Sequence, residues 1–185
     1  MTTFEYLAVL ISIIVGLGIT HLLGGVARFI SNPGKYKLYW VHLVWTAYVF
    51  VYLAMFWWFQ LWMNRVEEWT ALLYMFLVVW TVLLYVQCAV IMPRDFPDNG
   101  DFRQYFYGRR KWFLGLLLAD VVFESVDAII KEHTDLLLGF AVMGIPLVIA
   151  ITTKRPAVQA IVAVFGFSVL LWTHFIGGWD AVLTY

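Results

Sequence analysis

Hydrophobic residues occur along the chain in six long runs, and short polar breaks separate them. A helix needs roughly 20 apolar residues to cross a hydrocarbon core about 30 Å thick, and each run approaches or exceeds that length. The breaks contain residues typical of turns, such as Asn32, Pro33 and Gly34 after the first run. The pattern therefore predicts an all-α bundle of six transmembrane helices, over residues 4–30, 38–63, 69–92, 112–131, 135–153 and 157–178.

The fourth predicted helix, 112–131, is the least hydrophobic of the six because it contains three carboxylates and a lysine. A five-helix alternative stays open for that reason. Only Glu132, His133 and Thr134 join it to the fifth helix, which predicts a tight antiparallel hairpin. The longest connection is the segment 93–111, which is too short for a domain of its own. We therefore expect one integral membrane domain over the whole chain.

Composition supports the membrane prediction. Hydrophobic residues make up 63% of the 185 residues, charged residues make up 13%, and the mean hydropathy is +0.84. A water-soluble domain of this length needs many more charged side chains to cover its surface. The formal net charge is zero, whereas nucleic-acid binding requires a basic excess. The lipid bilayer is thus the expected partner, and nucleic acid is excluded.

Lys and Arg are distributed unevenly between the predicted connections. Arg65 and Lys131 belong to one side of the membrane. The opposite side, at the first, third and fifth connections and the adjoining helix ends, has Arg28, Lys35, Lys37, Arg94, Arg103, Arg109, Arg110, Lys111, Lys154 and Arg155. Because Lys and Arg collect in cytoplasmic loops, both termini are expected on the non-cytoplasmic side. The predicted location is the plasma membrane of a prokaryote.

The fourth predicted helix has an acidic face that is the strongest indication of function. Asp120, Glu124, Asp127 and Lys131 are spaced i, i+4, i+7 and i+11, so they share one side of the helix. Charged groups at membrane depth are costly and mark functional sites or internal polar networks. Glu5 and His174 fall at the same outer level of the first and sixth predicted helices.

Asp120, Glu124, Asp127, Glu5 and His174 thus form a candidate path for protons or cations. Carboxylates with a histidine also suit a divalent cation such as Zn²⁺ or Mn²⁺. A purely structural network, in which Lys131 pairs with Asp127, is an equally weighted alternative.

Two histidines suggest a second kind of site. His21 and His42 fall at similar depth on the first and second predicted helices, and two histidines on different helices are able to ligate a haem iron. A hydrogen-bonded packing role is commoner and is favoured here. Trp80, near mid-membrane, is interpreted as an aromatic packing residue without a functional role.

Small residues form a stripe on the first predicted helix. Ser12, Gly16, Thr20 and Gly24 follow one another at i, i+4 spacing, which lets another helix approach closely. Packing within the chain is favoured over a homo-oligomer contact, because a six-helix protein must first pack its own helices. A partner membrane subunit is a further possible occupant.

Motifs of familiar membrane enzymes are missing, including Gly-x-Ser-x-Gly, His-Glu-x-x-His and the Walker loop. An enzyme is therefore the less favoured class, and no particular cofactor is indicated. Three functions remain: a small proton or cation channel or transporter using the acidic face, a non-transporting subunit or scaffold that binds partner helices, and a haem- or metal-binding redox protein.

Overall fold

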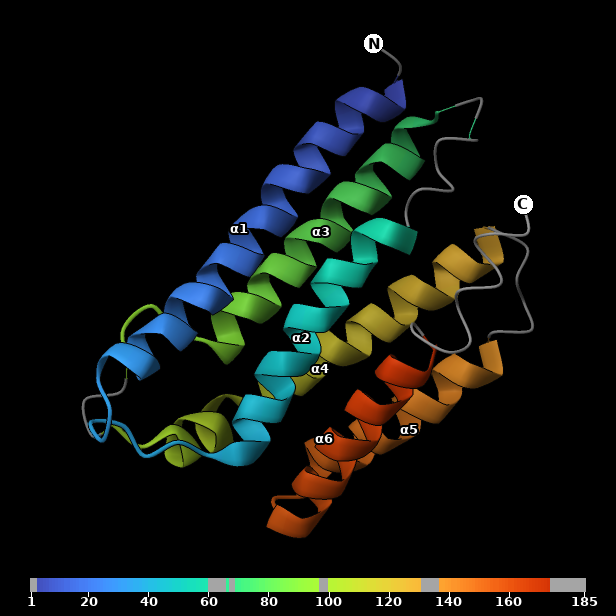
Figure 1. Cartoon of the computed structure of the whole chain (residues 1–185). Helices are drawn as coiled ribbons and strands as arrows, with labels where there is room; N and C mark the ends of the chain where they lie inside the picture. Colours follow the sequence, from blue (N-terminus) through green and yellow to red (C-terminus); the bar gives the residue numbers. More distant parts are fainter. Residues whose placement is uncertain (1–2, 60–65, 67–68, 97–99, 131–136, 174–185) are drawn as a thin grey trace.

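The computed structural model describes residues 3–59, 66, 69–96, 100–130 and 137–173 (Figure 1). This part of the chain forms six helices and no strand, so the predicted all-α fold with six helices is confirmed. The helices are α1 (Thr3–Ser31), α2 (Trp40–Phe59), α3 (Ala71–Ile91), α4 (Phe102–Ile130), α5 (Leu137–Thr152) and α6 (Pro156–Leu171).

One predicted boundary was wrong. Helix α4 begins at Phe102, ten residues before the predicted start at 112, so much of the predicted loop 93–111 is helical. The Asp101 Oδ1 atom accepts hydrogen bonds from the backbone N–H groups of Arg103 and Gln104, at 2.9 and 3.0 Å. Such a cap satisfies donors that a helix start leaves unpaired. Hydropathy identifies only the apolar part of a helix. The more polar turns of α4 that precede residue 112 were therefore not predicted to be helical.

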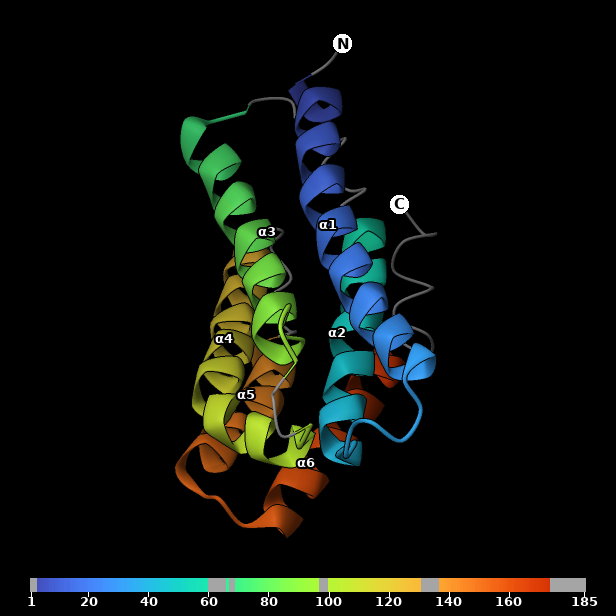
Figure 2. The same cartoon turned by 90° about the vertical axis from the view of Figure 1, so that its left-hand side faces the viewer.

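The helices are arranged in two layers of three, which Figure 2 shows side by side. One layer has the order α1–α2–α6 and the other the order α3–α4–α5, with neighbours in contact within each layer. Across the layers α1 packs on α3, α5 packs on α6, and α2 contacts both α3 and α4. The α1–α2, α3–α4 and α5–α6 connections lie at the same end of the bundle (Figures 1 and 2). We call this the inner end.

Among the described residues, the small-residue stripe of the first helix makes no close contact with another helix. Ser12, Thr20 and Gly24 are exposed, and a Cβ atom added at Gly16 or Gly24 would meet nothing within 4 Å. The expectation of intrachain packing through this stripe was therefore wrong for the part of the chain that the structure describes.

Other glycines of α1 make the close contacts instead. A Cβ atom at Gly18 would lie 2.9 Å from Leu53 Cδ2 and 3.2 Å from Cys88 Sγ. A Cβ atom at Gly25, seven residues on and therefore on the same side of the helix, would overlap the side chain of Met92. The face of α1 that meets α2 and α3 is thus defined by Gly18 and Gly25.

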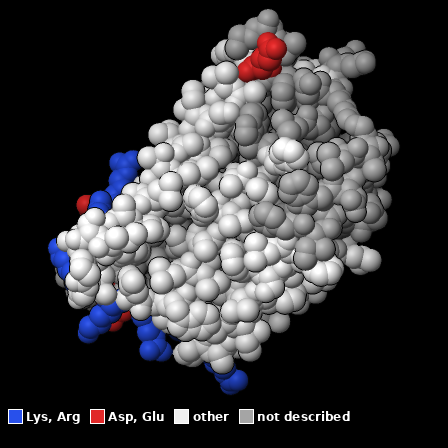
Figure 3. Space-filling view, in the orientation of Figure 1, with Lys and Arg blue, Asp and Glu red and all other residues white. Residues whose placement is uncertain are grey.

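The outer surface of the helices is strongly apolar. Large hydrophobic side chains such as Leu17 on α1, Leu72 on α3 and Ile161 on α6 are exposed. On the face shown in Figure 3, Lys and Arg lie at the inner end, and the described surface over the middle of the helices has no charged side chain. By length and composition α1 and α3 are able to cross a membrane, while the apolar helices Trp40–Phe56, Leu137–Thr152 and Pro156–Leu171 are shorter, at 10–17 residues.

Candidate functional site

The acidic face of α4 is directed into the bundle. Asp120 is 4% exposed, Asp127 is 8% exposed and Glu124 is half-buried. Val122 and Val126, on the other side of the same helical turns, are exposed. The charge-bearing residues are thus inside and the aliphatic residues outside, the reverse of an ordinary amphipathic surface helix.

Asp120 is held by two neutral donors from α3. The indole Nε1–H of Trp80 donates to Oδ1 at 3.1 Å, and the Nε2 group of Gln87 donates to Oδ2. The same Gln87 nitrogen lies 3.3 Å from the Leu116 carbonyl oxygen, which identifies it as the donor end of the amide. Both carboxyl oxygens of Asp120 therefore act as acceptors, and both donors come from one neighbouring helix.

Two tyrosines of α2 complete this site from the opposite layer. Tyr48 and Tyr52 are buried, with their ring planes 6° apart and their centroids 6.2 Å apart. Both are close enough to Glu124 and Asp120 to interact electrostatically, and the Tyr52 hydroxyl makes a hydrogen bond to the Glu124 side chain. We call the set contributed by the three helices the acidic network: Tyr48, Tyr52, Trp80, Gln87, Asp120 and Glu124.

Sequence reasoning missed four of these contributors: Tyr48, Tyr52, Trp80 and Gln87. Trp80 does pack on aromatic rings, with centroids 5.0 Å from Phe56 and 5.6 Å from Phe76, but it is also a donor to Asp120. The prediction that it has no role besides packing was therefore incomplete. A signal was present, because Trp80 and Gln87 are seven residues apart and share one face of an otherwise apolar helix. Nothing in the pattern pointed to Tyr52.

Three predicted members of the acidic site, Glu5, Asp127 and His174, are not part of the acidic network as defined above, and Asp127 is buried on the same helix, α4. Glu5 lies exposed in the first turn of α1, a helix that packs on α3 and α2. His174 lies outside the described residues, as does Lys131. An outer cluster of Glu5, Glu124, Asp127 and His174 therefore stays a prediction.

Both histidines are bound to the inner end of α3. Nε2 of His21 lies 2.6 Å from the Met92 carbonyl oxygen, and Nε2 of His42 lies 2.6 Å from the Ile91 carbonyl oxygen. An N–H group on each ring donates to a carbonyl that a helix end leaves unpaired. Iron ligation through Nε2 would break these bonds, so the arrangement gives the haem hypothesis no support. No group of three His, Cys, Asp or Glu side chains suited to a metal ion occurs among the described residues.

Two further side chains donate hydrogen bonds to backbone carbonyl groups at this end of α3 and just beyond it. The Tyr105 hydroxyl of α4 donates to the Val90 carbonyl at 2.7 Å, and an Arg28 guanidinium N–H donates to the Arg94 carbonyl at 2.5 Å. Burial raises the pKa of Tyr105 above its usual value of 10, against a smaller opposing effect of Arg109. The Tyr105 hydroxyl is therefore protonated at neutral pH and remains a donor. Side chains from α1, α2 and α4 together fix the inner end of α3.

The acidic network is thus the chemically distinctive part of the molecule, since it combines buried carboxyl and phenol groups between helices from both layers. Comparison of the chain with protein-family models, with curated proteins and with solved structures found no match.

Proposed function

We propose that the chain is an integral membrane protein of a prokaryotic plasma membrane and that it conducts protons through the acidic network. The membrane placement is supported by the aliphatic side chains that cover α1, α3, α5 and α6 on the outside. In water, an exposed apolar surface of this extent would cause association. In a bilayer the same surface is solvated by lipid.

The charge distribution supports an orientation with the inner end in the cytoplasm. Ten of the twelve Lys and Arg residues belong to the three inner-end connections and the helix turns beside them. Short loops with this excess stay on the cytoplasmic side. Both termini are then expected outside.

The observation that carries the functional proposal is the burial of Asp120 between α3 and α4, with neutral hydrogen-bond donors as its described partners. Burying a carboxyl group at membrane depth costs several kcal/mol if it stays charged. A packing role alone would be met at lower cost by Ser, Thr or Gln. A group that must bind and release a proton has to be an acid, and Asp120 and Glu124 are one helical turn apart.

The contacts favour a proton over a larger cation. Trp80 and Gln87 occupy acceptor sites on both Asp120 oxygens, and N–H groups there compete with a metal cation for the same lone pairs. Proton transfer needs only a chain of groups that both donate and accept, and the Tyr52 hydroxyl beside Glu124 is such a group. The proposed path runs along α4 through Asp120, Glu124 and Asp127.

The test is proton flux into liposomes that contain the purified protein, under an imposed potential and with a pH-sensitive dye inside. Glu124→Gln keeps the shape of the side chain and one carbonyl acceptor for Tyr52 but removes the titratable group. We expect it to abolish flux while circular dichroism stays unchanged. Asp95→Asn, which neutralises an exposed acid at the inner end, is the matched control and should conduct normally.

Equal flux for Glu124→Gln and the unsubstituted protein would remove Glu124 from the path. Absence of flux from correctly folded unsubstituted protein would refute conduction altogether. A chain that alkaline carbonate extracts from membranes would refute the membrane placement as well.

The exposed stripe on α1 favours a second candidate, a membrane subunit that binds a partner helix. Ser12, Gly16, Thr20 and Gly24 leave room for a close helix contact that this chain does not itself fill within the described residues. Gly16→Leu should then abolish co-purification of a partner or a second copy, whereas Leu17→Ile, on a different part of the exposed surface, should not. Unchanged association in Gly16→Leu would exclude this face as the interface.

A further inference from the structure

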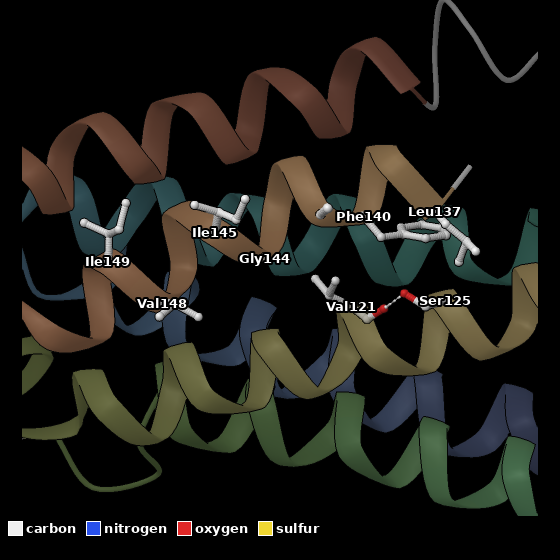
Figure 4. Close-up of a pocket in the computed structure, with 9 residues that line it drawn as sticks. Val121, Ser125, Leu137, Phe140, Gly144, Ile145, Val148 and Ile149 are labelled. Atoms are coloured by element: carbon white, nitrogen blue, oxygen red, sulfur yellow. Dashed lines mark hydrogen bonds between the residues drawn. The ribbon is translucent and has the colours of Figure 1, made fainter. Parts of the chain in front are cut away.

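An apolar groove lies between α4 and α5, and no member of the acidic network lines it (Figure 4). Its volume is about 460 Å³. Its lining includes Val121 and Ser125 of α4 and Phe140, Gly144, Ile145 and Val148 of α5. The only hydroxyl among these six side chains, that of Ser125, donates to the Val121 carbonyl at 2.7 Å, so it needs no partner from a ligand.

The two helices that flank the groove are in contact with each other. A Cβ atom at Gly144 would lie 3.8 Å from Leu118 Cδ1 and 3.9 Å from Val121 Cγ1, which is ordinary van der Waals contact. A single hydrocarbon chain is much thinner than a helix, which is about 10–12 Å across with its side chains. An acyl chain is therefore able to lie along this shallow apolar surface.

The length of the groove suits one leaflet of a bilayer. The α5 residues that line it run from Leu137 to Ile149, a separation of twelve helical rises that corresponds to about 18 Å. Half of the hydrocarbon core of a bilayer is about 15 Å thick. A lipid acyl chain that enters from the inner side would therefore lie along the groove over most of its length.

Positive charge lies where the groove approaches the inner end. Lys154 and Arg155 are exposed in the short connection after α5, and Lys154 is five residues beyond Ile149 in the sequence. Lys111 is exposed on α4 and shares a helix face with Leu118 and Ser125, at i+7 and i+14.

Arg110 links α4 to the end of α5 through hydrogen bonds. It is 2% exposed and donates to the Thr153 carbonyl at 2.5 Å and the Ile151 carbonyl at 3.1 Å. The start of the apolar part of α4 is thereby tied to the end of α5. Lys111 on α4 and Lys154 after α5 consequently lie at the same end of the two helices that form the groove.

We propose that this groove binds one acyl chain of an anionic phospholipid whose phosphate is held by Lys111, Lys154 and Arg155. The inference rests on the membrane placement proposed above but not on proton conduction. The apolar lining favours binding of the acyl chain, and the positive charge at the inner end favours an anionic headgroup over a zwitterionic one.

The experiment is native mass spectrometry of the delipidated protein in detergent, titrated with phosphatidylglycerol or with phosphatidylcholine. We expect tighter binding of phosphatidylglycerol. Lys111→Gln and Lys154→Gln should each weaken that binding about 5-fold, and the double variant about 25-fold, since a basic residue near an anionic headgroup contributes on that scale. Lys35→Gln with Lys37→Gln, at a different inner-end connection, is the matched charge control and should change little.

A second pair of variants tests the groove itself. Ala141→Phe places a ring among the lining residues and should weaken binding of both lipids, while Val142→Phe, at a neighbouring exposed position outside the lining, should not. Equal affinity for the two lipids, or equal losses in test and control variants, would overturn the proposal. Proton flux measured on the same preparations separates the outcomes, because lost lipid preference with normal flux contradicts only the lipid site.

Discussion

Replacing Asp120 by asparagine separates the structural role of this residue from its proposed chemistry. The asparagine oxygen still accepts from Trp80 Nε1, but its amide nitrogen would face the donor nitrogen of Gln87. A half-turn of the Gln87 amide relieves that conflict, because Gln87 Oε1 is buried without a described hydrogen-bond partner. The Leu116 carbonyl loses the Gln87 contact but keeps the helical bond expected from the backbone N–H four residues on.

The expected magnitudes follow from counting these bonds. Asp120→Asn replaces the Gln87–Asp120 hydrogen bond by another and loses the 3.3 Å contact between Gln87 and the Leu116 carbonyl, so the free energy of unfolding should fall by about 1 kcal/mol. Asp120→Ala instead leaves the Trp80 N–H and one N–H of Gln87 without an acceptor, while the other Gln87 N–H keeps the Leu116 carbonyl. At a lower limit of about 1 kcal/mol for each unpaired buried donor, the loss is about 2 kcal/mol or more. Proton flux should be abolished in both variants, because neither side chain titrates.

Stability is measured by SDS unfolding in mixed micelles, followed by circular dichroism, and flux in liposomes as above. If Asp120→Asn is as destabilised as Asp120→Ala, the described hydrogen-bond geometry is wrong. If Asp120→Asn is stable and conducts normally, Asp120 does not bind the transported proton and the network is structural. Asp95→Asn again provides the control for neutralising an acid at the surface.

Two further predictions concern packing and the inner end. Gly18→Leu should destabilise the protein by about 1–3 kcal/mol because its side chain overlaps Leu53 and Cys88, whereas Gly16→Leu should change the free energy of unfolding by no more than about 0.5 kcal/mol; equal losses in SDS unfolding would contradict the assigned packing face. Tyr105→Phe should cost about 1 kcal/mol because the Val90 carbonyl loses its donor, and Tyr6→Phe, at a 65% exposed tyrosine, should cost nothing measurable; an unaffected Tyr105→Phe would show that this hydrogen bond contributes nothing.

Hydropathy was sufficient to predict the six helices, because long apolar runs and turn residues are properties of local sequence. It misplaced the start of α4, where Phe102 and Arg103 begin a polar helical segment that a search for apolar residues does not detect. Asp101 at that boundary is a capping signal. Used alongside hydropathy, it would have moved the predicted start.

The acidic face was predicted for the same reason, since Asp120, Glu124 and Asp127 are related by the periodicity of one helix. Their partners belong to other helices, and a single sequence does not reveal which faces of two helices meet. The glycines of α1 illustrate this limit. The i, i+4 stripe through Gly16 and the i, i+7 pair Gly18 and Gly25 are both regular patterns, and only the three-dimensional structure identifies the second as the contact between helices.

The chemistry of the Asp120 partners bears directly on the choice between a structural and a conducting network. A buried Arg or Lys would hold Asp120 as a carboxylate, because removing one charge of a buried pair costs several kcal/mol. Trp80 and Gln87 are neutral donors, so they favour the carboxylate form of Asp120 less strongly than a paired cation would. After an amide turn, Gln87 is also able to accept a hydrogen bond from protonated Asp120 through Oε1. The site therefore accommodates both protonation states, which a proton carrier requires and a permanent packing contact does not.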